Sequence, residues 1–311
     1  MKKLILLTTS LLLLHYNIVL AQLYQDAGGV AITMHSKSEI KTLPNGSPLA
    51  GRKFSFNTYD IWTPLPFFKV GKMEVFSTLN YRMLDINYDE NIALDPNRPD
   101  KIHEVKSVIF VKYPLSKSWS VVGLAMPSLA SDFKDPISSD DVVLQGALAL
   151  TRKIDIASDL EIGLGLFATY VFGELQFIPA FTLNYESANG KWVGQAYWPR
   201  FSMLYNINKN SQFGFAASID GTEYNLKNYV DLQGESIDNA DFTIIHTGLQ
   251  YNRRVYKDFW LQVQGGIATG NQYQLFDSNN EEIVNADYSL KDMTYAKVMM
   301  TYRFDTNKID K

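Results

Sequence analysis

Apolar and polar side chains alternate with a period of two along several stretches of this chain. The clearest stretch is 159–172, where every even position from Leu160 to Phe172 is apolar or aromatic and most odd positions are charged, polar or small. This period predicts a β-strand with one apolar face, because a helix would need apolar residues three and four positions apart. The stretch exceeds the about five or six residues of an ordinary strand and reaches the about 9 to 11 that cross a membrane.

The same alternation recurs elsewhere, and the segments between such stretches differ regularly in length. Further alternating stretches occupy 142–151, 212–219, 259–268 and 295–304. Short turns are predicted at 115–118, 153–158, 187–191, 207–211 and 254–258, and longer polar loops at 88–101, 131–140, 226–241 and 276–291. Short periplasmic turns and longer outer loops are typical of outer-membrane barrels. The sequence therefore predicts an all-β, membrane-spanning, antiparallel up-and-down β-barrel.

The number of strands depends on Pro199. The apolar set before it lies on even positions up to Trp198, and the set after it lies on odd positions from Phe201 to Tyr205. Such a slip of one residue marks either a tight reversal or a β-bulge. A reversal gives about 14 strands, an even number as expected for such barrels, and about 12 is the alternative.

Composition fits a membrane barrel without requiring one. The mean hydropathy is −0.13, an ordinary value for a soluble protein, and aromatic residues make up 13% of the chain. Barrel strands show lipid only every second side chain, and aromatic residues gather at the membrane interfaces. A soluble β-sandwich or periplasmic barrel is the alternative, and strand length and loop asymmetry favour the membrane.

The first residues have the pattern of a secretory signal peptide. Lys2 and Lys3 precede an apolar run from Leu4 to Leu14, and the small residue Ala21 ends a cleavage site before Gln22. We expect residues 1–21 to be removed and residues 22–311 to form one barrel with a polar tail at 305–311. The chain has no cysteine, which excludes a lipoprotein leader, disulfides and thiolate metal sites.

Net charge limits the partners. Cleavage after Ala21 removes Lys2 and Lys3, so the formal net charge falls from −4 to −6. This mild acidity argues against nucleic-acid binding, which needs a concentrated basic surface. The expected partners are outer-membrane lipids, lipopolysaccharide and, during insertion, the barrel-assembly machinery. The oligomeric state is left open.

Several short motifs resemble an uncharacterised outer-membrane β-barrel family, a domain of unknown function. They are Phe172-Gly173-Glu174, Pro179, Asn184-Tyr185, Lys191-Trp192, Trp198-Pro199 and Ser218-Ile219-Asp220-Gly221. The resemblance covers about residues 28 to 304. The resemblance implies an outer-membrane location and a β-barrel fold. The family has no established activity, so the resemblance implies none for this chain.

Few residues offer chemistry. Three histidines follow the leader, namely His35, His103 and His246. His103 and Ser107 would share a strand face more than about 10 Å apart, too far for a hydrogen bond, and His246 is expected to point into the lumen with no serine partner evident. Asp85 to Asp89 resembles the start of a calcium loop, but Glu90 replaces the required glycine and Pro96 the final glutamate. We therefore predict no catalytic, cofactor-binding or metal-binding residues.

The functional expectation is a structural barrel or a narrow passive pore for small polar solutes, not an enzyme. Charges of both signs are expected inside or at the rim, at Arg82, Arg152, Arg303, Glu74, Glu161 and Glu186. Trp119, Trp192, Trp198, Tyr170 and Tyr302 fit an aromatic girdle. The alternative is an outer-membrane lipid or lipopolysaccharide hydrolase. A transporter of hydrophobic solutes would need an N-terminal plug, for which little chain precedes the first strand.

Overall fold

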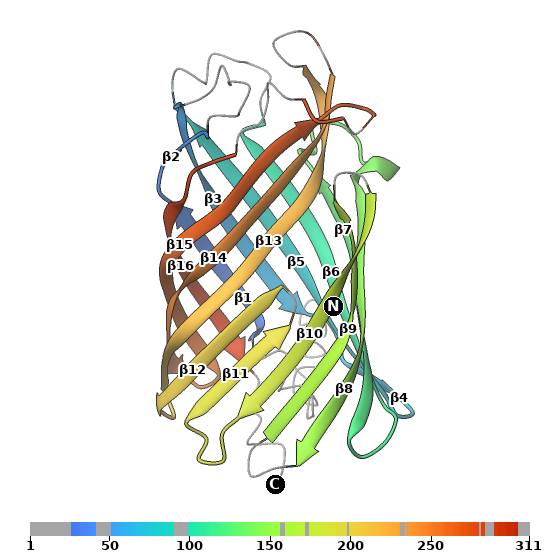
Figure 1. Cartoon of the computed structure of the whole chain (residues 1–311), viewed down its shortest axis with the longest axis vertical. Coiled ribbons are helices and arrows are strands. Elements are labelled where there is room, and N and C mark those ends of the chain that lie inside the picture. Colours follow the sequence, from blue (N-terminus) through green and yellow to red (C-terminus); the bar gives the residue numbers. More distant parts are fainter. Residues whose placement is uncertain are drawn as a thin grey trace, which may run out of the picture.

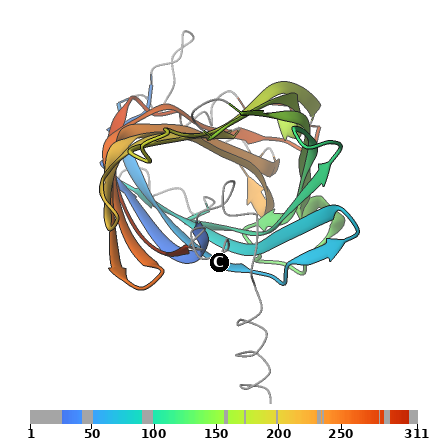
Figure 2. The ribbon, with the colours of Figure 1, turned by 90° about the horizontal axis from the view of Figure 1, so that it is seen from below.

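The computed structural model describes residues 26–41, 51–89, 99–155, 159–171, 174–197, 199–230, 234, 236–279, 281–283 and 289–303. Fourteen antiparallel strands form a closed ring (Figures 1 and 2). They are β1 (Asp26–His35), β3 (Lys53–Pro64), β5 (Met73–Tyr88), β6 (Lys101–Pro114), β7 (Trp119–Ser131), β8 (Val142–Asp155), β9 (Asp159–Val171), β10 (Glu174–Glu186), β11 (Trp192–Tyr197), β12 (Arg200–Asn208), β13 (Ser211–Val230), β14 (Ser236–Tyr256), β15 (Phe259–Phe276) and β16 (Met293–Arg303). Two short strands, β2 (Ser38–Glu39) and β4 (Phe68–Val70), and the 3-10 helix η1 (Ser139–Asp141) lie at the ends of the wall.

Each wall strand pairs with its neighbours in the chain, and β1 closes the ring by pairing with both β16 and β3. The prediction of a 14-stranded up-and-down barrel is confirmed. Pro199 lies in a tight reversal, because β11 ends at Tyr197 and β12 begins at Arg200. The slip in apolar phase seen in the sequence is thus a change of strand, not a bulge.

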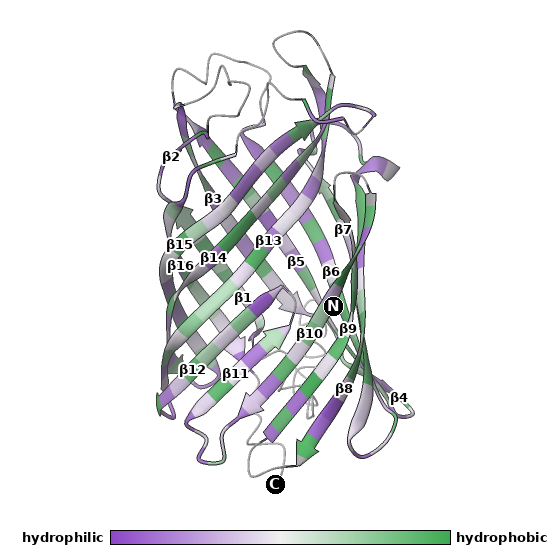
Figure 3. Ribbon diagram, viewed as in Figure 1, coloured by the Kyte–Doolittle hydropathy of each residue, from purple (hydrophilic) through white to green (hydrophobic). Residues whose placement is uncertain are grey.

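The alternating pattern separates a lipid face from a lumen face, as Figure 3 shows along the strands. On β9 the Leu164 side chain is 77% exposed on the outside, whereas Glu161 and Phe167 are buried inside. Inward glycines let neighbouring strands approach closely: a Cβ on Gly165 would collide with the backbone carbonyl of Leu148. The predicted faces of β9 are confirmed for the side chains that the structure describes.

The ends of the barrel differ. Short turns join the strands at one end, which also carries exposed aromatic side chains: Trp119 lies under Arg152, and Trp192 packs against Tyr205. These positions match part of the predicted girdle and its rim arginine. Trp198 lies outside the described residues, as do residues 1–25 with the expected signal peptide and residues 304–311. No helix among the described residues is long and apolar enough to cross a membrane.

The wall is much taller on one side than on the other (Figure 1). β13, β14 and β15 have 20, 21 and 18 residues, whereas β11 and β12 have six and nine. The expectation of a long polar loop at 226–241 is wrong, because β13 and β14 continue through most of it. Leu226 and Ile237, read from sequence as loop residues, are buried inside the taller wall.

Candidate functional site

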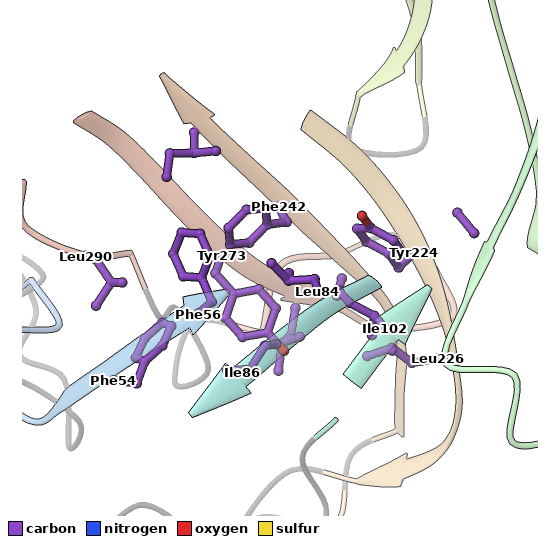
Figure 4. Close-up of a cluster of buried hydrophobic side chains, with 14 of the residues drawn as sticks. Phe54, Phe56, Leu84, Ile86, Ile102, Tyr224, Leu226, Phe242, Tyr273 and Leu290 are labelled. Carbon is purple, nitrogen blue, oxygen red and sulfur yellow. The ribbon is translucent and has the colours of Figure 1, made fainter. Parts of the chain in front are cut away.

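The half of the lumen nearest the long loops is filled with apolar side chains that project inward from the wall (Figure 4). Phe54 and Phe56 of β3 have no exposed surface, and the ring centroids of Phe56 and Phe242 are 4.6 Å apart. We call this cluster the internal core; it comprises Ile40, Phe54, Phe56, Leu84, Ile86, Ile102, Ala130, Val143, Tyr224, Leu226, Tyr229, Ile237, Ala240, Phe242, Ile244, Ala268, Tyr273, Leu275, Leu290, Met293 and Tyr295. Side chains packed to this degree leave no room for a water column. Side chains of the wall itself fill this level of the lumen, which the sequence analysis did not predict.

A charged cluster lies directly beneath the internal core. The Arg82 guanidinium of β5 is 2.6 Å from a carboxylate oxygen of Asp60 and 3.3 Å from one of Asp220. All three side chains are less than one-fifth exposed. Paired charges of this kind are tolerated inside a protein, whereas an unpaired one is costly. Arg82 therefore faces inward as predicted, and it ties three strands together across the lumen.

Two histidines connect this cluster to the internal core. Nδ1 of His246 is 3.2 Å from Oδ2 of Asp220, and its Nε2 is 2.7 Å from Nε2 of His35. Nδ1 of His35 then lies 3.0 Å from the backbone carbonyl of Phe56. The chain of contacts runs from the charged cluster to a residue of the core. Its position confirms that His246 points into the lumen.

A serine and an acid lie beside His246, but they do not form a nucleophilic relay. The pairing of β13 with β14 places Ser218 opposite His246. The Ser218 hydroxyl donates to Oδ2 of Asp220 at 3.2 Å, and both ring nitrogens of His246 are already engaged. A nucleophilic serine needs a free imidazole nitrogen as its base. The sequence did not reveal this juxtaposition, because it depends on the register between two strands.

His103 lies on the outside of the barrel. Its Nδ1 is 2.9 Å from the hydroxyl of Tyr81, and its ring stacks between those of Tyr81 and Phe133. Ser107 follows four residues later on the same strand, as the sequence indicated. The contacts of His103 are those of an interfacial aromatic cluster.

The segment from Asp85 to Asp89 forms the upper end of β5. Ile86 belongs to the internal core, and Asp89 makes an ion pair with Lys37 at 2.5 Å. Residues 90–98, which include the rest of the calcium-loop comparison, lie outside the described residues. Among the residues that the structure describes, no group of three or more histidine, cysteine, aspartate or glutamate side chains is arranged to hold a metal ion.

Below the internal core the lumen contains a cavity of about 490 Å³. One side of it carries charged groups, which are Asp60, Arg82, Glu104, Lys106, Asp220 and Lys297. The opposite side, from β7 to β10, is mainly apolar: Leu124, Met126, Phe167 and Ile178 lie there, together with the hydrogen-bonded pair of Gln145 and Thr169. The cavity therefore has two chemically different walls facing each other.

The cavity extends toward the short turns, where one further ion pair lines it. Arg303 is 2.6 Å from Asp26 at the ends of β16 and β1. Nearer the same end, Lys112 lies 2.9 Å from Glu161, whose carboxylate also accepts a hydrogen bond from Thr151. Arg303 and Glu161 thus face inward, as the sequence predicted. The interior carries charges of both signs, held in pairs.

Comparison with known proteins gives a family and a fold. A family model described as a domain of unknown function (DUF6268) matches residues 75–303. No curated protein sequence matches the chain. The barrel resembles those of Gram-negative outer-membrane proteins at very low identity.

Three solved structures illustrate the resemblance. An outer-membrane channel from Pseudomonas putida F1 aligns with 9% identity and a TM-score of 0.45, covering 93% of this chain and 100% of that one. The toluene transporter TodX of P. putida aligns with 9% identity and a TM-score of 0.37, over 91% of this chain and 94% of that one. Outer membrane phospholipase A from Escherichia coli aligns with 10% identity and a TM-score of 0.36, over 94% and 96%.

Proposed function

The chain belongs to the DUF6268 family, and from the lumen described above we propose that it is a passive channel of the outer membrane that takes up small molecules without catalysing a reaction. The observation that carries this proposal is the cavity of about 490 Å³ beneath the internal core. Ligand cavities in proteins typically occupy about 300 to 1,000 Å³. The barrel therefore keeps an interior space in which a small molecule fits.

The cavity favours a channel over a purely structural barrel. A structural barrel has no need of an open interior, and small barrels fill theirs with side chains. Here the wall fills only the half near the long loops and leaves a chamber that reaches Asp26 and Arg303 near the short turns. Those turns face the periplasm in barrels of this type. On this proposal, solutes enter the chamber from that side.

The hydrogen bonding favours a channel over a hydrolase. Ser218 and His246 are adjacent, yet the serine hydroxyl donates to Asp220 and the imidazole has no free nitrogen. His103 is outside the lumen and bonds to Tyr81. Neither histidine is placed to activate a nucleophile. The sequence alternative of a lipid hydrolase therefore ranks second.

Uptake by proteoliposomes tests the proposal, with one variant that fills the chamber and one that does not. Ala216 lines the chamber, whereas the neighbouring Phe215 is 42% exposed on the outer face. We expect Ala216→Trp to slow uptake of small solutes strongly and Phe215→Trp to leave it unchanged. Folding of each variant is checked by heat-modifiable gel migration. Absence of uptake by the folded unmodified protein, or equal uptake by both variants, would overturn the channel.

A further inference from the structure

The hydrogen-bonded wall of the barrel is interrupted on one side. The β11–β12 hairpin ends at Tyr197 and Arg200, and the last residue of β13 that pairs with it is Ser218. Above that level β10 pairs only with β9, over 174–181, and β13 pairs only with β14, from Asp220 to Tyr224. Figure 1 shows this gap between β13 and β10 above the short hairpin.

Described residues mark the lower and upper edges of the gap. Its lower edge is the hairpin reversal, where the backbone N–H of Ile219 donates to the carbonyl of Pro199 at 2.9 Å. Its upper edge is the segment 131–141, where Ser131 pairs with Asn225 of β13 and the Asn225 amide donates to Asp141 at 2.7 Å. Lys227 and Asn228 add hydrogen bonds to the same segment. We call this opening the window and its upper edge the lintel.

The chamber reaches the window from inside. Its lining includes Ile178 of β10, Tyr197 and Pro199 of the hairpin, and Ile219 and Gly221 of β13, so it borders the lower edge and both sides of the gap. An open strand edge at membrane depth is tolerated only where it is buried in protein or faces water. Because the chamber borders these edges, we assign the unpaired backbone groups of β10 and β13 to contact with water from the chamber.

The outer surface places the window at the edge of the apolar band. On the β10 side Phe177 and Leu175 are 64% and 48% exposed. On the β13 side the exposed apolar residues Phe213 and Phe215 lie below the window, and Glu223 stands beside it. The outer surface of β10 beside the window is thus apolar and faces lipid, whereas the outer surface of β13 beside it is polar. This combination fits the outer interface of the membrane, given that the long loops face outward.

The chamber also contains a positive charge without a partner. The acidic groups on its inner wall are held in pairs, by Arg82 with Asp60 and Asp220, by Lys106 with Glu104 and by Arg303 with Asp26. In the described part of the chain the Lys297 ammonium makes no hydrogen bond or ion pair, although it borders the chamber. Asp60 and Asp220 act on Lys297 electrostatically but are bound by Arg82, so an anionic ligand would be the first direct counter-ion of Lys297.

We infer that the chamber exchanges its contents sideways with the outer leaflet through the window between β10 and β13, and that its ligand is a single-chain amphiphile with a carboxylate head. The head lies at Lys297, and the tail lies against the apolar wall formed by Leu124, Met126, Phe167 and Ile178. The internal core blocks the axial route toward the long loops, so the window is the route from the chamber to the outer leaflet. This inference rests on the proposed channel function and adds its route and ligand class.

Crosslinking after folding tests the route. The chain has no cysteine, so Phe177→Cys with Gly221→Cys gives two thiols on opposite sides of the window, which a bis-maleimide bridges. The control pair, Tyr251→Cys with Val263→Cys, joins two outward positions that already face each other on β14 and β15. We expect bridging of the window pair to lower transfer of a fluorescent carboxylate amphiphile by about tenfold or more, and bridging of the control pair to leave it unchanged.

Lys297→Met tests the ligand class. We expect it to lower transfer of the carboxylate amphiphile by about tenfold and to leave transfer of the matching alcohol unchanged. Full transfer through the bridged window would overturn the route while leaving the channel intact. Equal loss for the acid and the alcohol would overturn the anionic ligand. Failure of the unmodified, folded protein to pass any solute would instead defeat the channel proposal itself.

Discussion

His35 and His246 meet Nε2 to Nε2 at 2.7 Å inside the barrel, although 211 residues separate them in the chain. Since Nδ1 of His35 faces a carbonyl oxygen, it must carry a proton. The two Nε2 atoms share one hydrogen bond, and Nδ1 of His246 faces Oδ2 of Asp220 at 3.2 Å. This chain of contacts links the backbone of β3 at Phe56 to the charged cluster around Arg82.

Replacing His246 by leucine should destabilise the barrel. The change removes the hydrogen-bond partner of Nε2 of His35 and one of the contacts of Asp220 inside the lumen, and an unsatisfied buried polar group costs about 1 to 3 kcal/mol. The free energy of unfolding in urea, measured in detergent micelles, gives the loss. His103→Leu is the control, because this side chain is on the outside and we expect a change within about 0.5 kcal/mol. Equal losses for the two variants would contradict the internal role of His246.

A charge on the lipid face of β9 should impair folding. Leu164 is 77% exposed on the outer face, so Leu164→Arg places a guanidinium in lipid at a cost of about 2 to 4 kcal/mol near mid-bilayer. Folding yield into lipid vesicles measures the effect. Gln272→Arg is a matched control on the polar outer surface of β15, and we expect it to fold normally. Normal folding of both would show that Leu164 does not face the membrane.

The lintel should loosen in acid. Burial raises the pKa of the Asp141 carboxyl, but hydrogen bonds from the Ser138 backbone N–H and the Asn225 amide outweigh it and hold the pKa below the ordinary value of 3.8. A lowered pKa contributes stability that is present above pH 3.8 and is lost as the pH falls through the folded value. Pepsin cleavage within 131–141 should therefore accelerate between about pH 4 and pH 2.

Asp141→Asn is the control for the acid effect, because its side chain does not titrate. We expect its lintel to be cleaved faster than that of the unmodified protein at the upper end of this range, and the two rates to converge in stronger acid. The same pH dependence in both proteins would mean that another group governs the loosening.

Ser218→Ala should have no effect on phospholipid hydrolysis, because we expect none from the unmodified protein. The Ser218 hydroxyl donates to Asp220 and has no access to an imidazole nitrogen, so we expect no phospholipid hydrolysis by either protein. Release of fatty acid from phospholipid vesicles is the measurement, with the folded barrel at high concentration. Hydrolysis that disappears in Ser218→Ala would establish the enzyme that the hydrogen bonding argues against.

Strand positions could be read from the sequence, because lipid on one side and the lumen on the other impose a period of two. The reversal at Pro199 was visible as a slip in that period, and it decided the strand count. The internal core was not visible. Phe54 and Phe56 point inward whereas Ile61, on the same strand, points to lipid. Alternation separates two faces of a strand but does not say which one faces inward.

The candidate site depends on register and on strand length, which local patterns do not contain. Ser218, His246 and His35 come together only because β13 pairs with β14 in one particular register and β1 closes the ring. The window arises because β11 and β12 stop early while β13 continues through a stretch that reads as a polar loop. The upper part of β13 is rich in polar residues because its outer surface lies above the membrane, although its backbone still forms a strand.

The early end of the β11–β12 hairpin also changes the mechanics of the barrel. On the short-turn side of Pro199 every strand is hydrogen-bonded to both neighbours, and this continuous pairing fixes the circumference of the barrel. Above Pro199 the upper wall is a split ring, fastened across the gap by the short β7–β13 contact and the side-chain ties of Asn225, Lys227 and Asn228. A split ring changes its width by bending, without breaking any strand pairing. The diameter of the upper barrel therefore depends on a few polar contacts across the gap as well as on the packing of the internal core.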